Sequence, residues 1–190
     1  DDAFDGVDFN TISLLAGMMI LVGITQRTGI FQFVAVWTVK KSKANPQAIL
    51  VALATVTAAF SAFFDNVTTV LLIVPVTLLI VEKLEVSPYP FLFAEVFASN
   101  IGGTATLIGD PPNIMIGSAV GLTFTDFITE LGPVIVIVHI AVLFLLYLFG
   151  GRQLTSSAEA RARIMAFDER SSITDTRLLR QSLAVMSIVI

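Results

Sequence analysis

The chain has 190 residues, of which 55% are hydrophobic and 14% are charged, and its formal net charge is −4. Soluble domains carry about 25% charged residues, so this composition indicates a protein embedded in a lipid bilayer rather than a nucleic-acid-binding or acidic soluble domain. The absence of cysteine and the presence of only one histidine, His139, exclude disulfides, thiolate metal sites and histidine-cluster metal sites.

The first expected membrane segment lies at residues 12–25, an apolar stretch that becomes long enough to cross a bilayer when residues 7–11 are added. The acidic residues 1–8 before it lack the basic region of a signal peptide. Residues 30–39 are apolar and aromatic and lead into a lysine-rich end at 40–43. At about 1.5 Å per residue they cover about half of the roughly 30 Å hydrocarbon core, so we expect an interfacial helix with an aromatic face.

Two apolar legs, residues 47–64 and 67–81, meet at Asp65-Asn66 without a solvated loop between them. Pro46 stands where proline is favoured, at the start of a helix. Two arrangements fit this pattern. We favour a re-entrant helical hairpin whose tip lies near the middle of the membrane, and the alternative is two full spans joined by a tight turn.

A second interrupted segment follows. Residues 91–122 are apolar except at 102–113, which predicts a broken transmembrane helix made of two half-helices around an unwound stretch. A short polar connection is expected at 123–130, and residues 133–149 form the clearest transmembrane helix of the sequence.

The rest of the chain divides into a polar linker and a last apolar run. Residues 151–181 contain six arginines and are expected to form a partly helical linker. Residues 182–190 are apolar but too short to cross a bilayer, and we interpret them as the start of a truncated transmembrane helix. Residues 1–150 then form one membrane domain, and the fold class is an all-α polytopic membrane protein.

The positive charges predict the orientation of these segments. Lysine and arginine are enriched in cytoplasmic loops, so residues 40–46 and 150–181 should both face the cytoplasm. Either arrangement of the two legs places an even number of crossings between these basic segments, so the two assignments agree. We expect an integral protein of a prokaryotic plasma membrane.

The first polar string, residues 65–69, stands where polar groups are costly. A carboxylate at the centre of a membrane helix costs about 2.5–3.5 kcal/mol, so such groups line a cavity, pair with another group or bind an ion. The side chains of Asp65, Asn66, Thr68 and Thr69 offer the oxygen atoms that hard cations such as Na⁺ prefer. The alternative is that Asp65 and Asn66 only cap the second leg.

The second polar string combines helix-breaking residues with polar side chains. Its glycines allow positive φ and close approach of the backbone, and its prolines cannot continue a helix. We expect the second half-helix to begin near Pro112-Asn113, with its positive end facing the break. No Lys-Ser/Thr pair follows the glycines, which argues against a nucleotide-binding loop. The candidate residues are Asn100, Gly102, Gly103, Thr104, Thr106, Asp110, Pro111, Pro112 and Asn113.

One further acidic residue, Glu95, lies in the first half-helix. Its spacing from Ser99 and Gly102 places the three residues on one helix face. Glu95 is therefore either a proton carrier or an interfacial residue whose side chain snorkels to the headgroups. His139 is expected to pack between helices.

Together these strings resemble the ion transporter superfamily. That group includes the P proteins, the NhaD-type Na⁺/H⁺ antiporters, the ArsB-type arsenite permeases, the divalent anion/Na⁺ symporters and related citrate transporter-like domains. The matching stretches are 15–23 (LAGMMILVG), 61–75 (SAFFDNVTTVLLIVP) and 94–117 (AEVFASNIGGTATLIGDPPNIMIG). The P proteins and their bacterial relatives carry similar DNVTT and IGDPPN strings.

The resemblance implies two inverted repeats, each with a re-entrant hairpin and a broken helix, of which residues 1–150 correspond to the first and residues 151–181 to the linker that leads to the second. It implies that Asp65, Asn66 and Thr68 occupy the place of a Ser-Asn-Thr hairpin motif that binds Na⁺ and substrate in the symporters. Residues 102–113 then form the loop that completes the ion site, with Na⁺ held at Asp65, Asn66 and Gly102. Asp65 differs from the serine of those symporters, and its negative charge disfavours a dicarboxylate substrate and favours a cation or proton.

The sequence therefore predicts a secondary active transporter that works by alternating access, and not an enzyme. Cation antiport coupled to H⁺ or Na⁺ is the leading hypothesis, efflux of arsenite or another anion is the second, and a channel or membrane scaffold is the last. We expect no cofactor besides a coupling Na⁺ or H⁺. The expected partners are a small inorganic ion, the lipid bilayer, a second repeat of the same protein and a second copy in a homodimer, with no nucleic acid.

Overall fold

The computed structural model describes residues 9–166 and 172–189, and this part of the chain is helical without any strand. The elements are, in chain order, α2 (Phe9–Gln26), α3 (Ile30–Lys41), α4 (Pro46–Ser61), α5 (Asn66–Leu84), α6 (Tyr89–Thr104), α7 (Pro111–Val120), α8 (Phe124–Asp126), the π-helix η1 (Phe127–Leu131), α9 (Gly132–Phe149), the 3-10 helix η2 (Gly151–Gln153), α10 (Ala158–Met165) and α11 (Thr176–Val189). The predicted all-α polytopic fold is confirmed.

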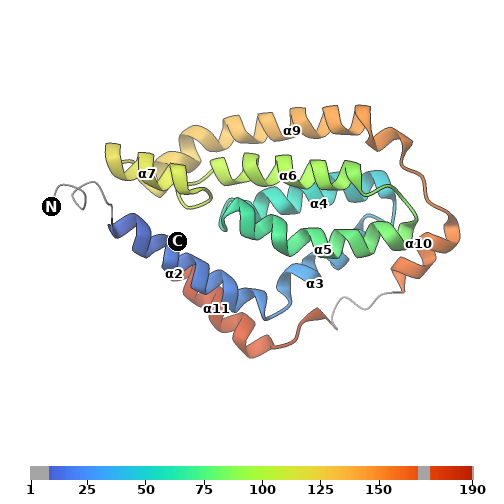
Figure 1. Ribbon diagram of the computed structural model, residues 1–190, viewed down its shortest axis with the longest axis horizontal. Helices are drawn as coiled ribbons and strands as arrows, with labels where there is room; N and C mark the ends of the chain where they lie inside the picture. The colour runs from blue at the N-terminus through green and yellow to red at the C-terminus, as the bar shows by residue number, and fades with distance from the viewer. Residues whose placement is uncertain (1–8, 167–171, 190) are drawn as a thin grey trace.

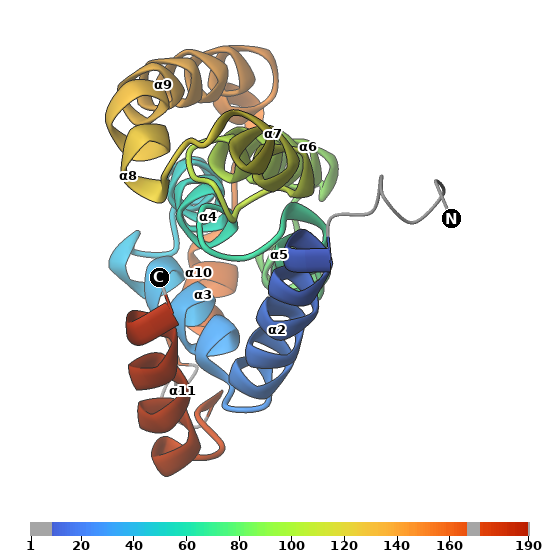
Figure 2. The same cartoon turned by 90° about the vertical axis from the view of Figure 1, so that its left-hand side faces the viewer.

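Helix α6 lies at the centre of the molecule and packs against α4, α5 and α9 (Figure 1). Its buried face contributes Phe91, Ala94 and Ala98 to a core that α4 completes with residues such as Leu50 and Leu53. In contrast, α9 buries none of its side chains although it is strongly apolar. Figure 2 shows α9 at the edge of the bundle, so this surface is available to lipid or to another membrane element.

Two helical stretches of the described residues are long and apolar enough to cross a membrane, namely α5 and the continuous segment Phe124–Phe149. The segments Ala16–Gln26 and Ile30–Lys41 together form a third candidate, bent by 60° at the break between them. The predicted helix at 12–25 is thus present within α2. The break falls at Gly29, whose positive φ of 78° and lack of a Cβ let the backbone of Ser172 approach.

The predicted helix at 30–39 is present as α3, but its aromatic residues do not share one face. Phe31 is fully buried and contacts Phe60 and Phe64, at ring-centroid distances of 4.9 and 5.4 Å. Trp37 is instead 45% exposed and carries the Lys41 ammonium 5.6 Å from its ring centroid. The expectation of one aromatic face was wrong because Phe31 packs against Phe60 of α4 and Phe64 of the following turn, whereas Trp37 lies at the surface.

The two apolar legs form α4 and α5, joined by the short turn at 62–65. Asn45 caps α4 by accepting a hydrogen bond from the amide of Gln47 at 3.0 Å, and Pro46 occupies the first turn as predicted. With 19 residues α5 is long enough to span a membrane, whereas α4 has 16. The re-entrant hairpin stays a prediction.

The predicted interruption of the second segment is present but shorter than expected. Helix α6 continues through Gly102 and Gly103 to Thr104, and α7 begins at Pro111, so only residues 105–110 are unwound. The glycines at 102, 103 and 109 do not adopt positive φ. Of the two uses predicted for these glycines, the structure therefore shows the close approach of the backbone and not the positive φ.

The polar connection predicted at 123–130 was also wrong. Thr123 and Asp126 form a capping box, in which the Thr123 hydroxyl accepts from the Asp126 amide and the Asp126 carboxylate accepts from the Thr123 amide. This cap starts a helix at Phe124 that runs through η1 into α9. The T-x-x-D spacing was visible in the sequence and was missed.

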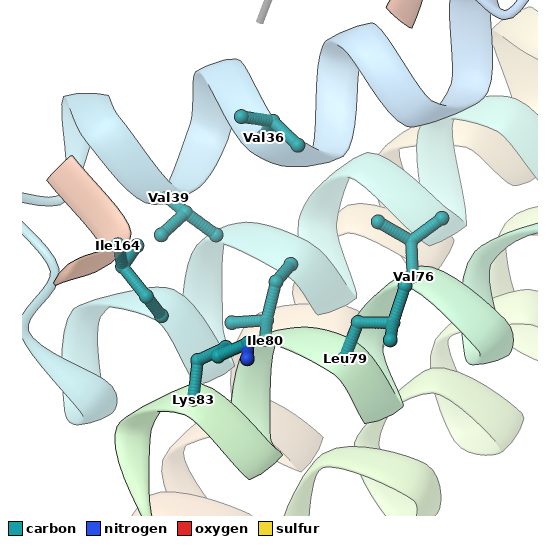
Figure 3. A pocket seen from close by; sticks show the side chains of 7 residues that line it. All are labelled: Val36, Val39, Val76, Leu79, Ile80, Lys83 and Ile164. Atoms are coloured by element: carbon teal, nitrogen blue, oxygen red, sulfur yellow. The ribbon is translucent and has the colours of Figure 1, made fainter. Parts of the chain in front are cut away.

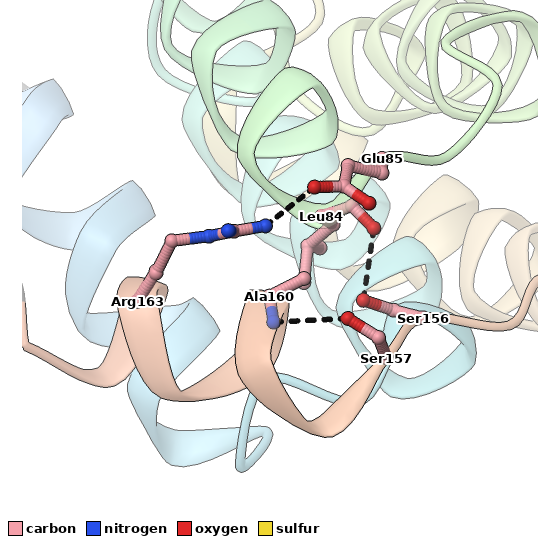
Figure 4. A network of polar contacts seen from close by, with 6 residues as sticks. All are labelled: Leu84, Glu85, Ser156, Ser157, Ala160 and Arg163. Atoms are coloured by element: carbon pink, nitrogen blue, oxygen red, sulfur yellow. Dashed lines mark hydrogen bonds and ion pairs between the residues drawn. The ribbon is translucent and has the colours of Figure 1, made fainter.

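The polar linker contains α10, which is attached to the end of α5 (Figure 4). Ser156 donates a hydrogen bond to the carbonyl of Leu84 at 2.8 Å, Ser157 caps α10, and Arg163 pairs with Glu85. Ile164 of α10 shares a small apolar pocket with Val39 of α3 (Figure 3). The basic end of α3 and the linker helix therefore lie at the same end of the molecule, as the orientation argument requires.

The last apolar run is part of a longer helix than predicted. Helix α11 begins at Thr176, and it packs along α2, where Met186 lies 3.9 Å from the Thr25 hydroxyl. The boundary at 182 was therefore wrong, because Asp175 accepts a hydrogen bond from the amide of Leu178 and so caps the helix ahead of the apolar residues.

Candidate functional site

The α4–α5 turn and the α6–α7 break lie against each other, at the end of the bundle opposite α10 (Figure 1). The Asn66 amide donates to the Asn100 carbonyl oxygen Oδ1 at 3.1 Å. The Thr106 hydroxyl donates to the backbone carbonyl of Ala62. The two polar strings, 34 to 44 residues apart in sequence, are thus joined by hydrogen bonds into one site.

In the first string Asp65 occupies the N-cap position of α5. Its Oδ1 accepts a hydrogen bond from the Thr68 amide at 2.9 Å, and its side chain remains half-buried. Asp65 therefore does cap α5, as the alternative interpretation expected. The cap uses only one lone pair of the carboxylate, so the others remain able to bind an ion or a proton. Thr69, one turn into the helix, is fully buried and its hydroxyl oxygen has no hydrogen-bond partner.

In the second string Asn113 holds the unwound stretch together. Its buried side-chain amide donates to the carbonyls of Gly103 and Thr106 at 3.1 and 2.8 Å. Thr106 in turn accepts from the amide of Gly109 at 3.1 Å through its hydroxyl. These bonds satisfy backbone groups that the break frees from the helical pattern, as any unwound segment inside a membrane requires.

The glycines at 102, 103 and 109 are needed because the backbone of neighbouring segments approaches them closely. A Cβ atom on Gly102 would lie 2.1 Å from the carbonyl oxygen of Ala58 in α4, and one on Gly109 would lie 2.4 Å from the carbonyl oxygen of Gly103. The Ser61 hydroxyl donates to the Ser99 carbonyl at 2.6 Å beside this contact. Without side chains at 102, 103 and 109, the break can therefore fit directly against α4.

The remaining predicted residues have clear places in the structure. Thr104 donates its hydroxyl to the carbonyl of Asn100 in its own helix at 2.8 Å, so it is held against α6. Pro111 and Pro112 form the first turn of α7. Asp110 is the N-cap residue of α7, and its side chain makes no capping hydrogen bond.

The charge at the site is negative. The carboxylates of Asp65 and Asp110 are near enough to interact electrostatically. The sequence contains no Lys or Arg at 44–82 or 84–151, so neither α4 nor the α6–α7 segment supplies a neutralising cation. Two carboxylates without a basic partner favour a bound cation or proton.

Glu95 lies apart from these residues, on the buried face of α6 that also carries Ser99 and Gly102. The side chain is 1% exposed and accepts a hydrogen bond from the Thr77 hydroxyl of α5. Its carboxylate is thus enclosed by helices, in contrast to a side chain that snorkels to the membrane surface. His139 packs against α4, with its Nε2 3.4 Å from the Thr55 hydroxyl.

The sequence did not single out Ser61 or Thr77. Each is buried and bonds across a helix interface, to Ser99 and Glu95 respectively. The spacing of hydroxyl residues could have indicated these buried polar faces. On α4, Thr57 and Ser61 are four residues apart, and on α5, Thr69 and Thr77 are eight apart, so each pair lies on one helix face.

Comparison with known proteins gives a consistent result. The family model described as "Citrate transporter" matches residues 1–190. An uncharacterised transporter of Mycobacterium tuberculosis is 50% identical over 185 residues, covering 97% of this chain and 43% of that protein. A "46 kDa membrane protein" of Mycobacterium leprae is 49% identical over the same length. The human P protein is 47% identical over 126 residues, covering 64% of this chain and 15% of that protein. The chain thus spans less than half the length of the mycobacterial relatives.

Proposed function

The chain belongs to the citrate transporter family, and from this premise we propose that it forms part of a secondary active transporter. The transporter moves a small inorganic ion across the plasma membrane by alternating access. Cation antiport driven by H⁺ or Na⁺ is the mode that the site favours. Neither a cofactor nor a catalytic step is part of this proposal.

The observation that carries the proposal is the pair of carboxylates at the joined breaks. Asp65 and Asp110 interact electrostatically, and no basic side chain occurs in the segments around them. In a site of low dielectric constant this negative charge attracts a cation or proton and repels a dicarboxylate. The family name therefore does not decide the substrate of this chain.

The groups around the break can complete the shell of a bound Na⁺. Asp65 and Asn66 supply side-chain oxygens, and the last turn of α6 around Gly102 supplies backbone carbonyls. Broken helices at the centre of a membrane commonly present carbonyls to a coupling ion in this way. We assign Thr68, Asn100 and the buried hydroxyl of Thr69 to the same oxygen-rich site.

The first turn of α7 makes a charged anion a weaker candidate. Helix N-termini bind anions through free backbone amides, but Pro111 and Pro112 have no N–H to donate. The next amide, that of Asn113, already donates to the carbonyl of Asp110 at 3.0 Å. Efflux of arsenite stays the second hypothesis, because arsenite is largely uncharged at neutral pH and would not be repelled by Asp65.

The lengths of the relatives support a larger functional unit. The mycobacterial proteins are more than twice as long as the matched region. We propose that the transport path runs between this unit and a second repeat of the same protein, and that the assembled transporter is a homodimer. The exposed apolar side chains of α9 are a suitable surface for such contacts or for lipid.

The test is ion flux in proteoliposomes that contain the complete transporter. Internal Na⁺ is followed after an inside-acid or inside-alkaline pH gradient is imposed, and arsenite release is followed in parallel. We expect Na⁺ to move against the proton flux, with reversal when the gradient is reversed. Arsenite release without pH-driven Na⁺ movement would favour the second hypothesis, and the absence of both fluxes would refute cation antiport and arsenite efflux alike.

A further inference from the structure

Glu95 is a buried carboxylate that the proposed cation site does not use. It lies in the second turn of α6, on the face that packs against α4 and α5. One carboxylate oxygen, Oε1, accepts a hydrogen bond from the Thr77 hydroxyl. The other, Oε2, is buried without a hydrogen-bond partner. Burying an ionised carboxylate with one oxygen that accepts no hydrogen bond raises the free energy of the folded protein. A bound proton removes the charge and so lowers this penalty.

In the described part of the chain, no positively charged side chain pairs with Glu95. Helix α4 has no ionisable side chain. On α5 the ionisable residues are Glu82 and Lys83, both exposed near the end of the helix, and on α9 they are His139 and Tyr147. None of these four groups contributes a hydrogen bond or an electrostatic interaction to Glu95, whose only polar contact in the described part of the chain is Thr77. The carboxylate therefore lacks the ion pair expected of a structural buried charge.

The partner of Glu95 behaves unusually for a threonine in a helix. Thr38, Thr55 and Thr57 each donate their hydroxyl to the carbonyl four residues earlier in the same helix, at 2.6 to 2.8 Å. Thr77 instead donates across the interface to Glu95. The hydroxyl is thus committed to the carboxyl group, and as both donor and acceptor it can adapt to either protonation state of Glu95.

Buried polar groups lead from Glu95 toward the cation site. Thr69 lies eight residues before Thr77 on the same face of α5, about 12 Å away along the helix axis, and its buried hydroxyl has no partner. Ser99 follows Glu95 by one turn on α6 and accepts the Ser61 hydroxyl through its carbonyl. Buried polar groups therefore lie between the break and Glu95 on both helices, at Thr69 and Thr77 on α5 and at Ser99 on α6.

We propose that Glu95 and Thr77 form a proton-binding site separate from the cation site at Asp65. This inference rests on the proposed function and assigns the two ions to different carboxylates. Asp65 binds the transported cation, and Glu95 binds the proton that is exchanged for it. In the conformation described here the proton resides on Glu95. When the bundle rearranges and water reaches the α5–α6 interface, the O–H bond breaks, the proton passes to water and the carboxylate is left ionised.

Infrared difference spectroscopy of the complete transporter tests the site without depending on transport. Exposed carboxyl groups are ionised at pH 7, so a carboxylic acid C=O band at that pH reports a buried protonated group. We expect Glu95→Gln to remove such a band and Thr77→Val to shift its frequency, with Thr77→Ser close to wild type. We also expect the band to disappear as the pH is raised. Glu130→Gln, which alters an exposed residue, is the matched control and should change nothing.

The spectra have outcomes that would overturn the inference. A spectrum that is the same in Glu95→Gln and wild type would show that Glu95 carries no proton. A band that persists at every pH at which the protein stays folded would show a permanently neutral structural acid. Thermal melting shows whether each variant is folded. If Glu95→Gln does not fold, the frequency shift in Thr77→Val decides whether Glu95 carries the proton.

A transport measurement separates this inference from the proposed function. In Glu95→Gln we expect loss of Na⁺ movement driven by a pH gradient, with exchange of labelled Na⁺ at equal pH retained. Loss of both in this folded variant, or retention of both, would contradict a proton-only role. If the wild type carries the protonated band but moves no Na⁺, the proton site stands and the cation antiport hypothesis fails.

Discussion

At the scale of single residues, Asp65 combines a structural and a chemical role that can be separated by substitution. Asparagine is as good an N-cap as aspartate, so Asp65→Asn should preserve the cap on the Thr68 amide while removing the charge. We predict that this variant melts within a few degrees of wild type but loses coupled Na⁺ flux. Asp65→Ala should additionally lose about 0.5–2 kcal/mol of stability with the cap. Unchanged flux and pH dependence in Asp65→Asn would reduce the residue to a cap.

Gly102 offers a second prediction at this scale. A Cβ at this position would lie 2.1 Å from the carbonyl oxygen of Ala58, which is backbone and cannot move aside. We expect Gly102→Ala to cost about 1–3 kcal/mol, the usual range for overpacking, and to lower the melting temperature in detergent. Gly17→Ala is the matched control, because no atom lies within 4 Å of its added Cβ and alanine is the better helix former. Equal melting temperatures for the two variants would contradict the close contact.

At the scale of elements, the start of α8 depends on a local motif. The Thr123 hydroxyl accepts from the Asp126 amide at 3.3 Å and also donates to its carboxylate. We predict that Thr123→Val, which removes this hydroxyl, costs about 0.5–2 kcal/mol locally and speeds hydrogen exchange of the α8 and η1 amides. Thr125→Val makes the same chemical change two residues later, outside the capping box, and should leave the exchange of α8 much closer to wild type. Similar exchange in both variants would show that the packing of α9, rather than the cap, holds this helix.

The elements also show what the sequence could and could not reveal. Long apolar runs bounded by proline and polar residues predicted the order of the main helices, because helices in a membrane need long stretches of apolar residues. Boundaries at Phe124 and Thr176 were missed because side-chain caps extend a helix beyond its apolar run. For the candidate site, the cost of polar groups at membrane depth marked both strings, and the resemblance to the ion transporter superfamily predicted that they would form one site. The partner of Glu95 could not be predicted, since the contact with Thr77 depends on how α5 and α6 face each other.

At the scale of the whole molecule, the two polar strings are joined more closely to each other than to the linker end of the bundle. Three hydrogen bonds join the end of α4, the α4–α5 turn and the start of α5 to α6 and the break after it, through Ser61, Asn66 and Thr106. The linker helix α10 instead contacts the far end of α5 through Glu85. If alternating access moves whole units around a fixed site, the two strings should move as one body.

Cross-linking tests this arrangement directly, because these 190 residues contain no cysteine that would compete with an introduced pair. Asn66 Nδ2 and Asn100 Oδ1 lie 3.1 Å apart, so a short bifunctional thiol reagent should link the cysteines of the double variant Asn66→Cys with Asn100→Cys in membranes. Asn66→Cys with Tyr89→Cys is the control, since Tyr89 is exposed at the opposite end of α6 and should not cross-link. The first pair should react equally in the presence and absence of a pH gradient if the strings stay together during transport. A yield that rises and falls with the gradient would instead show that the site opens between its two halves, and cross-linking of the control pair alone would contradict the packing of α5 on α6.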